Sequence, residues 1–430
     1  MHARFAAVHV ARRRLAIRRN IVLSLALLAA GACADTEPSA PSGPLGFVAT
    51  APIVAFIGVT VVPMDSERAL PDQIVVIDNG RITTIGSSGQ VDVPAGATRI
   101  DGRGRFLTPG LADMHVHLGD ADIEAYVSAG ITTVRNMWGV PGMLEFAAQS
   151  RGPLSTADDG TRASPAVYSA SPGIDGSPPT WGYTREISNP ADAEALVAEM
   201  ASEGWSFLKL YNRLSPEVYD ALADAAALHG IRFLGHVPWA VTLEHALDRG
   251  HASIEHLTGY DRALGSPVLP PLSWTLADAG GAAALAERTA LAGTWNCPTL
   301  VVTNAIGRRV LTPAEFEQSL ATRRAMVRAL RDAGAPLLVG TDGGIDIVRA
   351  GHAIHDELAE FVAAGLTPFE ALRAATSDAA RFLDQEGEFG MIVTGSRADL
   401  LLLDANPLAD IGNARRIAGV MIRGRWHARP

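Results

Sequence analysis

Residues 107–117 read Leu-Thr-Pro-Gly-Leu-Ala-Asp-Met-His-Val-His, an apolar run that ends in two histidines. A run of this length and composition predicts a buried strand. Side chains two positions apart on a strand point to the same face, so the rings of His115 and His117 share one face at the strand end. Both histidines are therefore candidate metal ligands.

Seven more apolar segments follow, separated by Ala- and Leu-rich helical stretches; they are residues 132–137, 166–171, 207–211, 232–236, 253–256, 294–300 and 337–342. Eight strands that alternate with helices predict an α/β fold with a (β/α)8 TIM barrel, whose reactive groups lie at the carboxyl ends of the strands. The alternative is a doubly wound open sheet, but no glycine-rich phosphate-binding sequence follows any strand. Residues 357–383 predict two amphipathic helices, the second capped by Thr367.

The segments before and after these central strands and helices have a different sequence pattern. Residues 53–62, 73–77, 81–85 and 98–106 predict short strands, and Asp-Asn-Gly at 78–80 predicts a hairpin turn. Residues 399–403 and 419–426 repeat this pattern near the C-terminus. The central segments are therefore flanked by two groups of β-strands.

Composition limits the function classes. The chain has 430 residues, 48% hydrophobic and 19% charged, which is typical of a globular protein with a large core. A net charge of -10 argues against nucleic acid as a partner. With only two cysteines, a disulfide framework and a thiolate zinc site are excluded, and Cys297 in an apolar strand predicts a buried side chain.

The N-terminus has the pattern of a secretory signal. Residues 1–32 contain six arginines and no acidic residue, and an apolar run over 21–30 precedes small residues. Ala30-Gly31-Ala32-Cys33 resembles a bacterial lipobox, and a Pro/Ser-rich tether follows. We expect a signal peptide over 1–32, a lipidated Cys33 with a tether over 33–52, and export to the periplasm or cell envelope. A lipid anchor would be the chain's contact with the membrane.

Other polar residues end the predicted barrel strands. Lys209 lies in the fourth strand, and His236, His256 and Asp342 end the fifth, sixth and eighth. Because strand ends meet at one end of a barrel, we expect these residues to lie near the first strand's histidines. Imidazoles and a carboxylate form a nitrogen and oxygen site suited to zinc or a similar divalent metal.

Lys209 is the only lysine among 36 basic residues, so the chain otherwise uses arginine. An ammonium group does not bind a metal. A lysine amine that reacts with carbon dioxide becomes an anionic carbamate, whose two oxygens can bridge two ions. Arginine stays protonated and cannot replace lysine in this chemistry. We therefore predict a carbamate on Lys209.

These motifs make the chain recognisable: it resembles the amidohydrolase superfamily of metal-dependent hydrolases, in its imidazolonepropionase-like or Xaa-Pro dipeptidase-like branch. The matching segments are residues 108–117, 130–135, 208–211, 235–237, 254–257, 340–342, 365–376 and 395–400. The resemblance implies a barrel over 109–387 and a small β-sandwich built from 53–108 and 388–430.

The resemblance also implies a centre of two divalent ions. In it His115, His117 and Asp342 hold one ion and His236 and His256 the other, while carboxylated Lys209 and a hydroxide bridge them. Zinc is the expected metal, with manganese, cobalt or iron as alternatives. Asp342 would be the catalytic residue, as the general base that takes the proton of the hydroxide.

The implied activity is hydrolysis of the C–N amide bond of a small molecule, such as a dipeptide or an N-acyl amino acid. One alternative is a hydrolase of cyclic amides, lactones or organophosphate esters; another is a non-catalytic, lipid-anchored binding protein. Residues 171–183 lack the histidine that dipeptidase-like relatives have in a loop after the third strand. Tyr211 is predicted either to contact the substrate or to be structural, and Arg135 either to bind a substrate carboxylate or to pair with an acidic neighbour. The oligomeric state is left open.

Overall fold

The computed structural model describes residues 45–48, 50–154 and 162–428, which belong to one unit of the chain. The predicted signal peptide, Cys33 and most of the tether lie outside these residues, so export and lipidation stay predictions. Among the described residues, no helix is both long and apolar enough to cross a bilayer.

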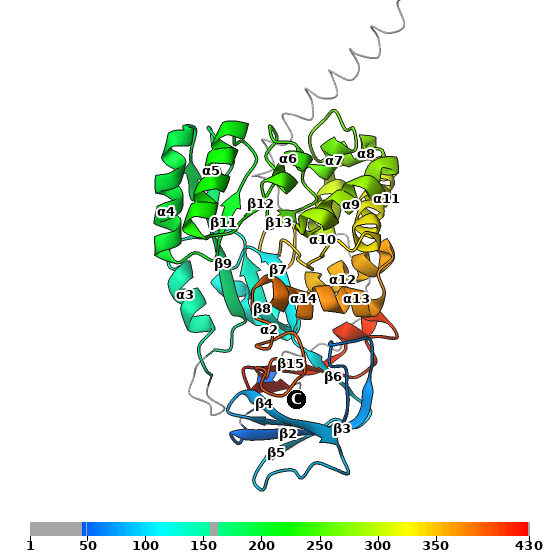
Figure 1. Cartoon of the computed structure of the whole chain (residues 1–430). Coiled ribbons are helices and arrows are strands. Elements are labelled where there is room, and N and C mark those ends of the chain that lie inside the picture. Colours follow the sequence, from blue (N-terminus) through cyan, green and yellow to red (C-terminus); the bar gives the residue numbers. More distant parts are fainter. Residues whose placement is uncertain (1–44, 49, 155–161, 429–430) are drawn as a thin grey trace, which may run out of the picture. The chain divides into compact units, whose positions relative to one another are not determined.

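A parallel sheet forms the central barrel (Figure 1). Its strands run in the order β7 (Leu111–Val116), β8 (Ile131–Asn136), β9 (Ala166–Asp175), β11 (Phe207–Leu210), β12 (Phe233–Gly235), β13 (Ser253–Glu255) and β14 (Trp295–Cys297), and β10 (Thr184–Glu186) pairs with β9. Residues 337–343 take the eighth position. Leu337 bridges Asn296 of β14, and Gly343 bridges Val116 of β7, which closes the sheet on itself. The predicted TIM barrel is confirmed.

Helices follow the barrel strands. They are α2 (Ile123–Ser128), α3 (Met143–Ser150), α4 (Ala193–Glu203), α5 (Pro216–His229), α6 (Leu243–Asp248), α7 (Tyr260–Ala263), α8 (Ser273–Leu276), α9 (Ala282–Ala292), α10 (Leu300–Val310), α11 (Pro313–Asp332), α12 (Ala353–Ala364), α13 (Pro368–Ala374) and α14 (Ser377–Phe382). Thr367 caps α13 as predicted, in a capping box with Glu370. The prediction of two helices over 357–383 is wrong, because the backbone of Thr376 leaves the helical region (φ -137°, ψ -94°) and separates α13 from α14.

A second, mixed sheet combines strands from both ends of the chain, which confirms the predicted β-sandwich. Its order is β1 (Gly46–Phe47), β17 (Arg425–Ala428), β16 (Ile417–Ile422), β15 (Leu400–Leu403), β6 (Phe106–Pro109), β2 (Ile53–Val61), β3 (Leu70–Asp78) and β4 (Arg81–Ser87), and β5 (Thr98–Asp101) pairs with β2. Asn79 and Gly80 both have positive φ angles, as the predicted tight turn between β3 and β4 requires.

The prediction of one strand over 107–117 is wrong, because β6 and β7 belong to different sheets. Gly110 separates them: its amide donates to the carbonyl of Asp399, beside β15. A Cβ atom at Gly110 would lie 2.2 Å from Oγ1 of Thr132, so only glycine fits where the chain passes from one sheet to the other. The predicted strands 98–106 and 294–300 are also shorter, ending at Asp101 and Cys297.

Gly110→Ala should destabilise the protein by about 1–3 kcal/mol, because the added methyl group overpacks the junction of the two sheets. Urea unfolding measures the change. Thr132→Ala in the same chain should restore part of the loss, because it removes the two nearest atoms, Oγ1 and Cγ2. Gly89→Ala, at a glycine with no heavy atom near the added Cβ, is the matched control. An equal effect of Gly89→Ala and Gly110→Ala would contradict this account.

Candidate metal centre

His115, His117 and Asp342 come together where β7 meets the eighth barrel segment. Nε2 of His117 lies 2.9 Å from Oδ1 of Asp342, and Nε2 of His115 lies 3.3 Å from the same oxygen. The backbone amide of Asp342 donates to the carbonyl of His115 at 2.7 Å, which fixes the two residues side by side. One ligand atom from each of the three side chains falls within 4.8 Å of the others. These three residues form a possible metal site.

His236 and His256 continue this cluster from the ends of β12 and β13. The ring centroid of His256 lies 4.6 Å from that of His115 and 4.8 Å from that of His236. Burial lowers the pKa of His256 to about 3 and that of His236 well below its ordinary value. Both imidazoles are therefore neutral near pH 7, which is the form that binds a metal.

Three of the histidines are oriented through Nδ1, which leaves Nε2 for a ligand bond. Each Nδ1 has an oxygen partner: Oε2 of Glu255 for His115 (2.7 Å), Oδ1 of Asn212 for His236 (2.8 Å) and Oγ1 of Thr299 for His256 (2.6 Å). The first two partners only accept, and the Thr299 hydroxyl donates to the carbonyl of Pro298, so it too accepts from the ring. The network therefore assigns the proton to Nδ1 in all three rings.

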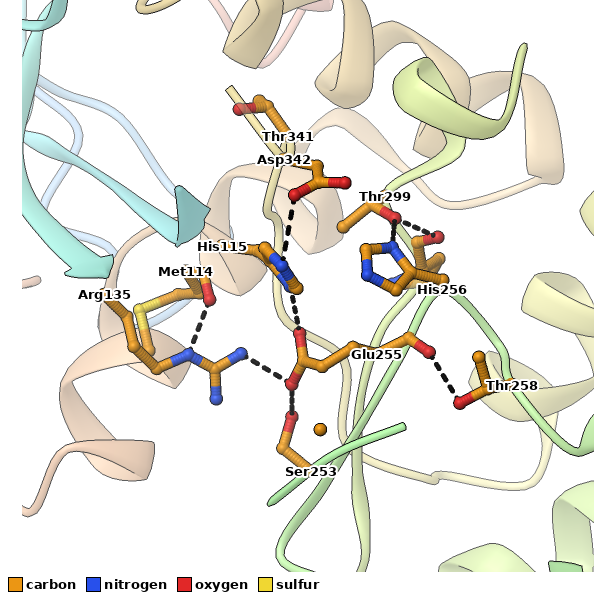
Figure 2. A network of polar contacts seen from close by, with 12 residues as sticks. Met114, His115, Arg135, Ser253, Glu255, His256, Thr258, Thr299, Thr341 and Asp342 are labelled. Atoms are coloured by element: carbon orange, nitrogen blue, oxygen red, sulfur yellow. Dashed lines mark hydrogen bonds and ion pairs between the residues drawn. The ribbon is translucent and has the colours of Figure 1, made fainter. Parts of the chain in front are cut away.

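Glu255 is a buried residue of the candidate site that the sequence analysis did not single out (Figure 2). Its Oε1 accepts hydrogen bonds from Arg135 (2.8 Å) and from Ser253 (2.6 Å), while Oε2 accepts from His115. Burial acts to raise the pKa of Glu255, but Arg135 and His115 outweigh it and hold the pKa well below its usual range. The signal was a charged residue inside an otherwise buried strand, directly before a candidate ligand.

Arg135 takes the second of its two predicted roles. Its side chain is fully buried, Nε donates to the carbonyl of Met114 at 2.5 Å, and the guanidinium pairs with Glu255. Arg135 therefore lies behind His115, where it supports the glutamate.

Lys209 lies on β11 with only 1% of its surface exposed. Its Nζ has no hydrogen-bond partner among the described residues, and burial lowers the pKa of its amine to about 8. A Cβ atom at Gly235, next to His236, would lie 2.9 Å from Cδ of Lys209. The Lys209 side chain thus runs past the end of β12, next to His236.

The residues present fit a divalent metal. Within the described part of the chain, three buried polar atoms of the cluster lack a hydrogen-bond partner: Nε2 of His115, Oδ1 of Asp342 and Nζ of Lys209. Unpaired polar atoms are costly in a protein interior unless something binds them. Neutral imidazoles and an ionised carboxylate are the donors that zinc and similar ions take in proteins.

A second group of potential ligands consists of His115, Glu255 and Cys297. Unlike the first group, its ligand atoms are not free to bind a metal. Nδ1 of His115 and both oxygens of Glu255 already have partners. Burial raises the pKa of the Cys297 thiol well above its ordinary value, so it is not a thiolate. Cys297 is fully buried, as the sequence predicts.

Tyr211 lies beside the cluster, with its ring centroid 4.2 Å from that of His236. Its hydroxyl accepts a hydrogen bond from Nε1 of Trp181 at 2.7 Å. Trp181 belongs to the loop between β9 and β10, the segment that lacks a histidine. The structure thus brings Tyr211 and the six predicted ligands into one region of the barrel.

Comparisons with known proteins agree with this geometry. The model of the Amidohydrolase family matches residues 106–427. An uncharacterized protein of Mycobacterium tuberculosis is 28% identical over 398 residues, covering 83% of this chain and 93% of its own. An imidazolonepropionase of Ralstonia nicotianae is 29% identical over 401 residues, with 84% and 94% covered.

Solved structures show the same fold. A putative prolidase from Bifidobacterium longum superposes with a TM-score of 0.70 at 26% identity, covering 88% of this chain and 95% of its own. A Xaa-Pro dipeptidase with bound methionine has a TM-score of 0.68 at 20% identity, with 88% and 100% covered. The chain belongs to the amidohydrolase family and is a hydrolase that acts on carbon–nitrogen bonds.

Proposed function

We propose that the chain hydrolyses the amide bond of a small substrate, such as a dipeptide or an N-acyl amino acid, at a centre of two divalent metal ions. The observation that carries this proposal is the set of unpaired ligand atoms at the ends of the barrel strands. His115, His117 and Asp342 would hold one ion. His236 and His256 would hold the other, and a carbamate on Lys209 would join the two.

The ions would supply a water of lowered pKa and a polarised scissile carbonyl. Asp342 supplies the proton chemistry. Its carboxylate, whose Oδ1 lies 2.9 Å from Nε2 of His117, would accept the proton of the attacking water and pass it to the leaving nitrogen. Tyr211, beside His236, is placed to contact the substrate.

A ring amide is the second candidate substrate. Imidazolonepropionases of several bacteria match about the same share of this chain as the uncharacterized relatives do. The chemistry at the metal centre is the same for a ring amide and an open-chain amide, because both have a C–N bond to a carbonyl. A panel of both kinds of substrate distinguishes them.

The direct test is hydrolysis by the zinc- or manganese-loaded protein. Two ions should bind per chain, a chelator should remove the activity, and open-chain amides should be cleaved faster than ring amides.

Asp342→Asn should lower kcat by about 10²–10⁴-fold, because the proton acceptor is lost. Metal content is measured in parallel because Asp342 is also a proposed ligand. Asp92→Asn, at an exposed position in the loop between β4 and β5, is the control. Fewer than one ion per chain after loading would refute the proposal.

The carbamate can be observed without an activity assay. Because Lys209 is the only lysine, no other lysine amine competes for carbon dioxide. In ¹³C-bicarbonate the metal-loaded protein should give one carbamate resonance by NMR. Lys209→Arg, which keeps the charge and cannot be carboxylated, should give none.

Lys209→Ala tests the bridge itself. This variant should lose most of its bound metal, and short carboxylic acids should restore part of it by supplying the missing oxygens. Full metal content without a carbamate resonance in the unaltered protein would contradict the role of Lys209.

Glu255→Gln tests the support of His115. Both carboxylate oxygens accept hydrogen bonds, and an amide nitrogen cannot, so one donor loses its partner and Arg135 loses its counter-charge. Metal affinity should fall about 10–100-fold, as measured by competition with a chromophoric chelator. Urea unfolding should show a loss of about 3–5 kcal/mol. Glu388→Gln breaks an exposed pair with Arg81 and should cost at most about 1 kcal/mol. Equal metal affinity in the two variants would refute the role of Glu255.

A further inference from the structure

Three aromatic side chains form a connected group at the carboxyl ends of neighbouring barrel strands: Tyr211 and Trp138 lie near candidate ligands, and Trp181 is hydrogen-bonded to Tyr211. Trp138 follows β8, Trp181 lies in the loop after β9, and Tyr211 follows β11. These three residues are named here the aromatic wall. Since β8, β9 and β11 are consecutive in the sheet, the wall occupies one side of the barrel end that carries the ligands.

The aromatic wall extends between ligands of the two proposed ions. Tyr211 packs on His236, with 4.2 Å between ring centroids. Trp138 stands perpendicular to Tyr211 at 5.3 Å, and its centroid lies 6.4 Å from that of His117. A substrate bound next to His117 and His236 would therefore have part of its surface against these rings.

The polar atoms of both indoles are satisfied inside the protein. Nε1 of Trp181 donates to the Tyr211 hydroxyl at 2.7 Å, and Nε1 of Trp138 donates to the carbonyl of Gly182 at 3.2 Å. What the two indoles offer to a ligand is therefore carbon surface. Trp181 remains 61% exposed, although it is a large apolar side chain next to the site.

The loop that carries Trp181 is held in place. Oδ2 of Asp175 accepts from the amide and hydroxyl of Thr180, and Oδ1 accepts from the amides of Gly176 and Arg213. Trp138 packs where a Cβ atom at Gly173 would lie 2.1 Å from its ring. Because the aromatic wall is already ordered before a ligand binds, its side chains lose little conformational entropy on binding.

We propose that the aromatic wall binds an aromatic group of the substrate next to the scissile amide; this inference rests on the proposed amide hydrolysis and narrows its substrate class. The expected substrates are N-acyl amino acids or dipeptides that carry an aromatic ring. An aromatic ring gains from stacking on the exposed indole beyond the burial of its surface, which an aliphatic chain of equal size does not. Two residues, Trp181 and Trp138, act as specificity determinants.

The first experiment compares N-acetyl-phenylalanine with N-acetyl-alanine on the metal-loaded protein. The ratio of their kcat/KM values should be at least tenfold in favour of phenylalanine and should fall about tenfold in Trp181→Ala. Trp181→Phe should keep most of the ratio, because the ring remains while the hydrogen bond to Tyr211 is lost. Leu291→Ala, at an exposed residue of α9, is the control and should leave the ratio unchanged. A Trp181→Phe variant as unselective as Trp181→Ala would overturn the aromatic wall, since Trp181 would then act only by positioning Tyr211.

A binding measurement separates this inference from the proposed function. Calorimetric titration of the metal-loaded protein with 3-phenylpropanoate and with propanoate needs no turnover. 3-Phenylpropanoate should bind at least tenfold more tightly, and Trp181→Ala should remove the difference. If the titration gives this result while no amide is hydrolysed, the inference about aromatic binding is supported and the proposed function is refuted. If amides are hydrolysed and the two acids bind equally, the wall is refuted and the proposed function stands.

Discussion

The hydrogen bonds of the Glu255 carboxylate are the interactions on which the arrangement of the candidate metal site depends. Its partners Arg135 and His115 come from β8 and β7, while Glu255 itself lies on β13, so the carboxylate joins strands across the barrel interior. A buried ion pair of this kind adds little to stability compared with apolar packing, because two charges have been removed from water. Its effect is on orientation: the His115 ring can turn only by breaking a charged hydrogen bond.

Two further buried acids hold the backbone near other candidate ligands, and neither is itself a candidate ligand. Asp113 accepts from the amide and hydroxyl of Thr341, directly before Asp342. Glu357 accepts from the first two amides of α10, directly after Thr299, the partner of His256. Burial raises the pKa of Asp113 to about 7 and that of Glu357 to about 8. The barrel thus contains costly buried acids where they fix the backbone next to a candidate ligand, Asp342, or next to Thr299, the partner of one.

The clustering of the candidate ligands could be predicted because two regularities of β-structure suffice. Alternation along β7 places His115 and His117 on one face, and barrel topology brings the ends of distant strands together. The contacts that support the ligands, such as those of Arg135 and Glu255, depend on which face of a strand turns inward. The sequence pattern does not determine that face. For that reason the role of Arg135 stayed open, and Glu255, in the same motif as His256, was not singled out. The break at Gly110 was missed because a lone glycine inside an apolar run does not show that its two halves enter different sheets.

The candidate ligands and the aromatic wall are held in place by different parts of this molecule. The candidate ligands lie on the barrel strands or directly after them, and Glu255, Asn212 and Thr299 orient the rings of His115, His236 and His256. Trp181 lies instead on a loop held by Asp175 and by the hydrogen bond from Trp138 to Gly182, and the indole of Trp181 donates to Tyr211 rather than to a candidate ligand. Changes in this loop can therefore reshape the surface that meets the substrate without moving the ligands. Trp138 is the exception: it packs against Gly173 of β9 and lies near His117, so its position is coupled to the barrel. The part of the aromatic wall nearest the proposed ions is thus set by the fold, and the part that faces solvent is set by the loop.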